Sequence, residues 1–196
     1  MEEAVVKGTE ATITDPMVEE LLAEKGKEYP TKGQWNTEVT GDAIRHWVEG
    51  IGDPNPLWQD EEYARKTRYG GTIAPFSFLL TCEGRPGRMG MPGIHALHAG
   101  VRFINHKPIR AGDKIINTGG LHDLVEKKQS SFARHTFLQT WFRNFRNQNG
   151  DLLSAFYTFA IRSERRTASE KGKYAGITKH VWTEEELQRV WEGIEK

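Results

Sequence analysis

The first half of the chain carries apolar residues at helical spacing. One buried helix face is marked by Ile44, Trp47, Val48 and Ile51, which follow the i, i+3, i+4, i+7 pattern. Thr40 stands where a helix cap is needed, and Gly52 stands where a left-handed residue can end the helix. We therefore predict a helix between these two residues.

Three further helices are expected around it. Asp15 and Pro16 form a start signal, so a helix should run from there to about Lys25. A short helix should follow Asp60 and end near Lys66, before Gly70-Gly71. The segment from Ile73 to Cys82 is apolar on more than one side, which is typical of a helix surrounded by other structure. Residues 29–36 and 83–93 read as loops.

From Gly100 onward the pattern favours β-strands. Strands are expected around 101–103, at 114–125 and at 131–145, with a turn over 108–113. Asn149-Gly150 is a hairpin signal. In the last strand, alternation puts one set of apolar residues on a single face, with Phe156 as an exception on the other face: Leu153, Ala155, Tyr157, Phe159 and Ile161.

Helices followed by a run of antiparallel strands indicate an α+β fold. The helix at 73–82 is the only segment apolar enough to cover the sheet, and a sheet wrapped around one central helix is a hot-dog fold. We assign this domain to residues 1–163. Residues 164–196 are expected to be a linker-like tail with an amphipathic helix at 183–194, opened by a capping box of Thr183 and Glu186.

Composition and charge exclude several classes of protein. The chain has 196 residues, a formal net charge of zero and 28% charged residues, so no strong field favours nucleic acid or an anionic membrane. Its single cysteine, Cys82, excludes an internal disulfide and is expected to be buried. Neither a secretory signal nor an apolar run of spanning length is seen, so a cytoplasmic location is expected.

The turn after the first of these helices carries the clearest chemical signal. Its sequence is Gly52-Asp53-Pro54-Asn55-Pro56-Leu57. This turn and its flanking helices resemble the MaoC-like family of (R)-specific enoyl-CoA hydratases and dehydratases. By that resemblance Asp53 is the catalytic aspartate, Asn55 is the structural asparagine of the turn, and Trp58 occupies the position of the catalytic histidine. An indole nitrogen has no basic lone pair, so Trp58 cannot accept a proton from water.

Other segments are similar to one subgroup of this family. They are Pro75-Phe76, Leu97 to Gly100, Pro108 to Asp113 and Arg146 to Gly150. The subgroup is the N-terminal half of two-domain dehydratases related to the dehydratase of type I fatty acid synthase. The resemblance implies a second hot-dog subunit that supplies an Asp-x4-His pair. It also implies a CoA thioester substrate such as a fatty or steroid acyl-CoA, no bound cofactor, and substrate binding by Gly71, Ile73 and the backbone amide of Phe76.

Two other functions stay open. One is a non-catalytic acyl-thioester-binding homodimer. The other is a hot-dog thioesterase in which Asp53 or Glu83 activates water. Simpler interpretations also compete: Asp53 can organise its turn, and Trp58 can fill a core or an interface. His95 or His98 is an alternative source of the missing base, whereas no residue cluster has the spacing of metal ligands.

Overall fold

The computed structural model describes residues 11–85, 90–127, 135–164 and 181–194. Its helices are α1 (Asp15–Leu22), α2 (Gly41–Ile51), α3 (Pro56–Gln59), α4 (Glu61–Lys66), the 3₁₀ helix η1 (Phe76–Cys82) and α6 (Glu184–Ile194). Its strands are β1 (Tyr29–Pro30), β2 (Ile73–Ala74), β3 (His95–Asn105), β4 (Ile109–Arg110), β5 (Ile116–Lys127), β6 (Thr136–Arg146) and β7 (Leu152–Ser163). None of the described helices is both long and apolar enough to cross a membrane.

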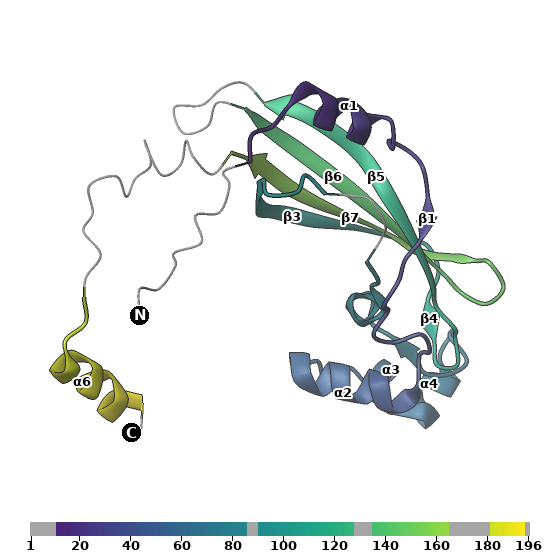
Figure 1. The fold of residues 1–196 in the computed structure, drawn as a ribbon. Helices are drawn as coiled ribbons and strands as arrows, with labels where there is room; N and C mark the ends of the chain where they lie inside the picture. The colour runs from purple at the N-terminus through teal and green to yellow at the C-terminus, as the bar shows by residue number, and fades with distance from the viewer. Residues whose placement is uncertain (1–10, 86–89, 128–134, 165–180, 195–196) are drawn as a thin grey trace.

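An antiparallel sheet dominates the described structure, as expected for the α+β fold. Its strand order is β1-β5-β6-β7-β3, and β2 pairs separately with β4. The sheet is bent, with α2, α3 and α4 near one end and α1 near the other (Figure 1). Strand β3 forms one edge of the sheet, and a bulge between His98 and Gly100 interrupts its pairing with β7. The bulge places Ala99 outside the regular ladder.

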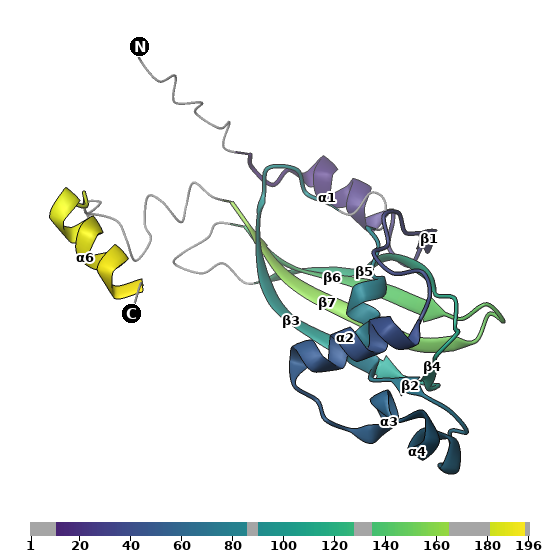
Figure 2. The same ribbon diagram turned by 90° about the horizontal axis from the view of Figure 1, so that it is seen from below.

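The core divides into two clusters on the concave side of the sheet. The first joins η1 and α2 to the sheet and contains, among others, Ile44, Val48, Phe78, Leu79, Phe145 and Phe156. Figure 2 shows α2 on the outside of this layer. The second joins α1 to the other end of the sheet and contains Leu21, Met91, Ile94, Leu121, Leu124 and Phe137. Helix η1 is thus the central apolar helix that the sheet surrounds at one end.

The expected helix from Ile73 to Cys82 is wrong in its first residues and in its type. Ile73 and Ala74 pair with β4 as a short strand, and a 3₁₀ helix begins only at Phe76. Pro75 separates the two, because proline has no amide hydrogen and disfavours helical geometry in the residue before it. The apolar segment is buried as expected, with Phe78, Leu79 and Cys82 fully inaccessible.

In β7, Phe156 was expected to be an apolar exception on the polar face, but it lies on the face that packs into the core. Phe156 is buried and its ring stacks on Phe103 of β3 at a centroid distance of 4.5 Å. Arg162 on the same face is also buried, and its guanidinium donates to the Met91 carbonyl. Tyr157 and Phe159, which alternation assigned to the apolar face, are only half-buried. The predicted core face of β7 was wrong because the true core face also contains buried polar side chains, Ser154 and Arg162, which form hydrogen bonds.

Smaller differences concern the bounds and types of single elements. Thr14, not Asp15, is the cap residue of α1, and no side-chain bond closes that cap. Tyr29 and Pro30 form a strand against β5 instead of a loop. Pro56 begins a helix, since proline suits the first helical position. Strand β3 begins at His95, before the expected start, because it pairs with β7 as far as Ser163.

Several predicted boundaries are confirmed. The Thr40 hydroxyl accepts from the Ala43 amide, and Gly52 adopts the left-handed conformation with φ 69°. Gly150, with φ 81°, lies in the turn between β6 and β7. The capping box of α6 is present, since the Thr183 amide donates to Glu186 and the Glu186 amide donates to the Thr183 hydroxyl. The expected strand residues 131–134 and linker residues 165–178 lie outside the described residues.

Candidate functional site

The turn between α2 and α3 is held by its own side chains. The Asn55 amide donates to Asp53 Oδ1 at 3.1 Å, and the Leu57 amide donates to Asn55 Oδ1 at the same distance. The second bond caps α3, with Asn55 as the N-cap. These are the local bonds that Asp and Asn favour in turns. The sequence therefore fixes the backbone that presents Trp58.

The structure brings the side chains of Trp58 and Asp53 together. The indole Nε1 donates to Asp53 Oδ2 at 2.9 Å. Trp58 is half-buried and packs against the first core cluster. Each carboxylate oxygen of Asp53 thus accepts a bond from the turn itself. This geometry accounts for a structural role of Asp53, and it provides no proton acceptor at residue 58.

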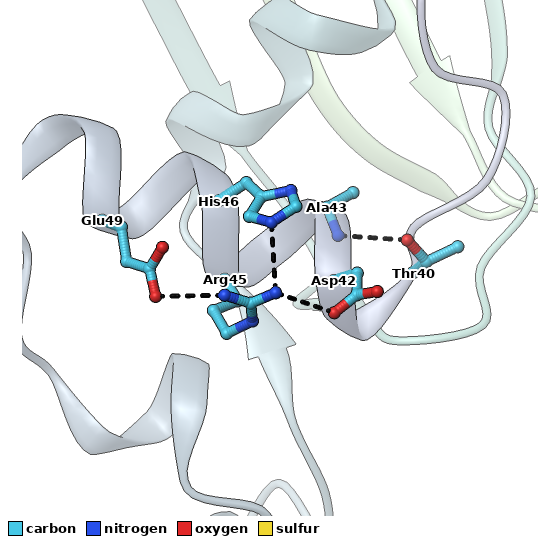
Figure 3. A network of polar contacts seen from close by, with 6 residues as sticks. All are labelled: Thr40, Asp42, Ala43, Arg45, His46 and Glu49. Carbon is cyan, nitrogen blue, oxygen red and sulfur yellow. Dashed lines mark hydrogen bonds and ion pairs between the residues drawn. The ribbon is translucent and has the colours of Figure 1, made fainter.

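Helix α2, which leads into this turn, has a polar network on its outer face. Arg45 contacts Asp42 at 3.1 Å, Glu49 at 3.3 Å and the His46 ring at 3.1 Å (Figure 3). All four side chains are exposed. Exposed ion pairs of this kind contribute little to stability. The network therefore lies on the solvent-exposed surface of α2, and none of its residues lines the cavity described next.

A cavity of about 440 Å³ opens beside Trp58. It combines α3, the turn after α4, β2, the start of η1 and the turn between β3 and β4, which gather at one end of the sheet (Figure 2). Its lining residues are Trp58, Arg68, Tyr69, Ile73, Ala74, Phe76, Asn105, His106, Lys107 and Pro108. Of the expected site residues, Trp58, Ile73 and Phe76 line it, whereas Asp53, Asn55 and Gly71 do not.

The histidines proposed as substitutes are not brought to this cavity. His95 and His98 lie toward the start of β3, and the cavity adjoins the residue that ends it, Asn105. At about 3.3 Å per residue, His98 and Asn105 are roughly 23 Å apart along the strand. His106 lines the cavity instead. Sequence reasoning missed His106, Arg68 and Lys107. His106 and Lys107 directly precede Pro108, which is a weak signal of a turn, whereas no signal in the sequence indicated Arg68.

Cys82 and Glu83 lie at the other end of η1. Burial raises the pKa of the Cys82 thiol to about 11, so the reactive thiolate is scarce near neutral pH. Burial also raises the pKa of Glu83, and the positive charge of Arg143 lowers it in part. Both shifts disfavour the ionised forms that nucleophilic or base catalysis needs. No group of three or more potential metal ligands exists among the described residues.

A larger hollow of about 940 Å³ lies beside α1. Its described lining includes Met17, Leu21 and the two carboxylates Glu20 and Glu24. It shares no residue with the cavity at Trp58. Since Trp58 and the start of η1 line the smaller cavity, that cavity is the candidate site.

Residues 23–154 match the family described as "FAS1-like, dehydratase domain region". A UPF0336 protein of Streptomyces avermitilis is 30% identical over 106 residues, which are 50% of this chain and 69% of that protein. A probable enoyl-CoA hydratase alpha subunit of Thermomonospora curvata is 29% identical over 144 residues. That match covers 64% of this chain and 44% of the relative, so the chain spans less than half of that subunit.

Solved structures with the same fold include MaoC-like proteins. The MaoC-like dehydratase of Rhodospirillum rubrum aligns with a TM-score of 0.52 and 22% identity, over 72% of this chain and 93% of that chain. A chain of the ChsH1-ChsH2 complex of Mycobacterium tuberculosis aligns with a TM-score of 0.57 and 17% identity, over 76% of this chain and 89% of that one. These similarities confirm the hot-dog fold.

Proposed function

We propose, from the membership of this chain in the FAS1-like dehydratase-region family of MaoC-like hot-dog proteins, that it is one subunit of a heteromeric enoyl-CoA hydratase or dehydratase. It would be the subunit that lacks the catalytic histidine. The observation that carries this proposal is the bond from Trp58 Nε1 to Asp53 Oδ2. Hydration needs a group that takes a proton from water. A residue that only donates occupies that position here, so a partner has to supply the Asp-x4-His pair.

The names of two similar proteins support a heteromer. One relative is named as an alpha subunit, and one structural neighbour is a complex of two different chains. In our proposal this chain shapes the acyl side of the pocket through Ile73 and Phe76, while the first amide of η1 faces the thioester oxygen. The substrate is a CoA thioester, and the reaction uses no further cofactor.

In our proposal, strand β3 is the surface that the partner contacts. It is an edge strand of eleven residues, with Leu97 and Val101 exposed to 56% and 50%. An open edge has unpaired backbone groups that a second sheet can satisfy. We therefore place the partner's edge strand alongside β3. Val101→Lys is expected to weaken assembly, whereas Ile116→Lys, at a residue exposed to 51% on β5, is the matched control.

The test is co-expression with a second hot-dog protein that carries Asp-x4-His. We expect the purified chain alone to leave the enoyl absorbance of crotonyl-CoA unchanged, and the co-purified complex to remove it. Free CoA is measured in the same reactions. Full turnover by the isolated chain would reject the proposal, and release of CoA without loss of the enoyl group would identify a thioesterase.

A non-catalytic acyl-thioester-binding homodimer is the second candidate. It is favoured by one observation: both Asp53 oxygens are occupied by groups of the same turn. A stable self-dimer that binds acyl-CoA, takes up no partner and stays inactive in every mixture would support this candidate over the heteromer.

A further inference from the structure

The cavity beside Trp58 has a charge pattern that the loss of a catalytic histidine does not explain. Its lining contains the basic side chains of Arg68 and Lys107 and the imidazole of His106, and no carboxylate among the residues that the structure describes. The hollow at α1 differs, since the charged side chains among its described lining residues are the carboxylates of Glu20 and Glu24. The charged side chains that line the cavity beside Trp58 are therefore basic.

Arg68 is available for an anion. Its guanidinium bonds the Tyr69 hydroxyl at 2.8 Å and stands 5.0 Å from the centre of that ring. Within the described parts of the chain, Arg68 has no acidic partner. Lys107 pairs with Asp151 at 2.6 Å, and both side chains are well exposed. Such an exposed pair is weak and can exchange partners at little cost.

The inner wall of the cavity is apolar. Ile73 and Ala74 are buried, and Trp58 and Phe76 are half-buried beside them. The indole N–H of Trp58 is already bonded to Asp53, so the ring offers its hydrocarbon surface. A volume of about 440 Å³ lies within the range of small-molecule sites. The apolar wall, together with the basic side chains of Arg68 and Lys107, suits a ligand that has an apolar body and one anionic head.

We propose that this cavity is a non-catalytic binding site for a small amphipathic anion, with the anionic head on Arg68 and Lys107 and the apolar body on Trp58, Ile73 and Phe76. The head is a phosphate or a carboxylate. A phosphate would come from the pantetheine arm of a thioester, and a carboxylate from the far end of an acyl group. The assignment of these two sources depends on the proposed function. The anion site itself depends only on the basic residues and the apolar lining of the cavity.

The experiment compares anions with neutral analogues of the same shape on the purified full chain by calorimetry. The first pair is 4′-phosphopantetheine and pantetheine, and the second is 4-phenylbutyrate and 4-phenylbutanol. We expect the anion to bind about tenfold more tightly in at least one pair, and this preference to weaken as salt is raised. The pair that shows the preference identifies the source of the head.

Charge variants locate the site. Arg68→Gln with Lys107→Gln is expected to remove the tenfold preference. Arg65→Gln with Lys66→Gln is the matched control, because both residues are exposed cations on α4 that do not line the cavity. The inference is overturned if neither anion exceeds its neutral analogue, or if the control pair lowers binding as much as the test pair. Such a failure leaves the co-expression assay for hydratase activity untouched.

Discussion

Replacing Trp58 by phenylalanine tests whether the bond to Asp53 stabilises the turn. Phenylalanine keeps most of the ring but has no N–H, so Asp53 Oδ2 loses its donor from residue 58. The matched control is Trp47→Phe. The Trp47 indole donates to the neutral Ser77 hydroxyl at 3.1 Å, and Trp47 also packs against the first core cluster.

The expected magnitudes follow from the two acceptors. A hydrogen bond to a charged group contributes about 1.5–3 kcal/mol, and one between neutral groups about 0.5–1.5 kcal/mol. Since Trp58 is half-buried, the lower end applies, and we expect its loss to cost about 1.5 kcal/mol. For a chain of this size the melting temperature should fall by about 3–6 °C. The area lost in the exchange of rings is common to both variants.

The assay is urea unfolding of the single variants Trp58→Phe and Asp53→Asn and of the double variant. We expect a coupling energy of about 1–2 kcal/mol between the two sites. Trp47→Phe combined with Asp53→Asn should be additive. A coupling between residues 53 and 58 below about 0.5 kcal/mol, the usual error of additivity, would refute the view that this bond fixes the turn.

Four further outcomes are expected. Thr40→Ala should cost about 1 kcal/mol in urea unfolding, because the Ala43 amide loses its cap. Gly119→Ala should destabilise the sheet in thermal unfolding, since its Cβ would lie 2.6 Å from the Phe142 carbonyl oxygen, whereas Gly41→Ala, with nothing within 4 Å, should not. Cys82 should resist alkylation in the native chain and react only on unfolding, because burial raises its pKa to about 11. The folded pKa of Glu83 is raised, so this residue should favour folding less as pH rises from about 4 to 7, and the melting temperature of Glu83→Gln relative to the original chain should increase over that range.

The elements with local signals could be predicted from the sequence. Thr40 and Gly52 set the ends of α2 through bonds and dihedral angles that depend on neighbouring residues alone. The Asn149-Gly150 turn and the capping box at Thr183 are local in the same sense. The resemblance carried by the turn at Asp53 led to the family, and the order of helices and strands led to the α+β fold. Such features need no knowledge of distant strands.

The rest depended on contacts far along the chain. The segment at Ile73 became a strand because β4 lies beside it, and Tyr29 became a strand because β5 does. The core face of β7 was misjudged because Arg162 is buried through a bond to the Met91 carbonyl, 71 positions away. The cavity lining was missed for the same reason, since Arg68 and His106 come together only when the sheet forms.

The division of the core into two clusters has a consequence for how the chain opens. Helix α1 is held by one cluster, and α2 with η1 by the other, while β6 contributes Phe137 to the cluster at α1 and Phe145 to the cluster at η1. Each end can therefore exchange its amides in its own partial opening, at a free energy below that of global unfolding. The sheet connects the two clusters, so the end with α1 can open locally while the end that contains Trp58 stays folded.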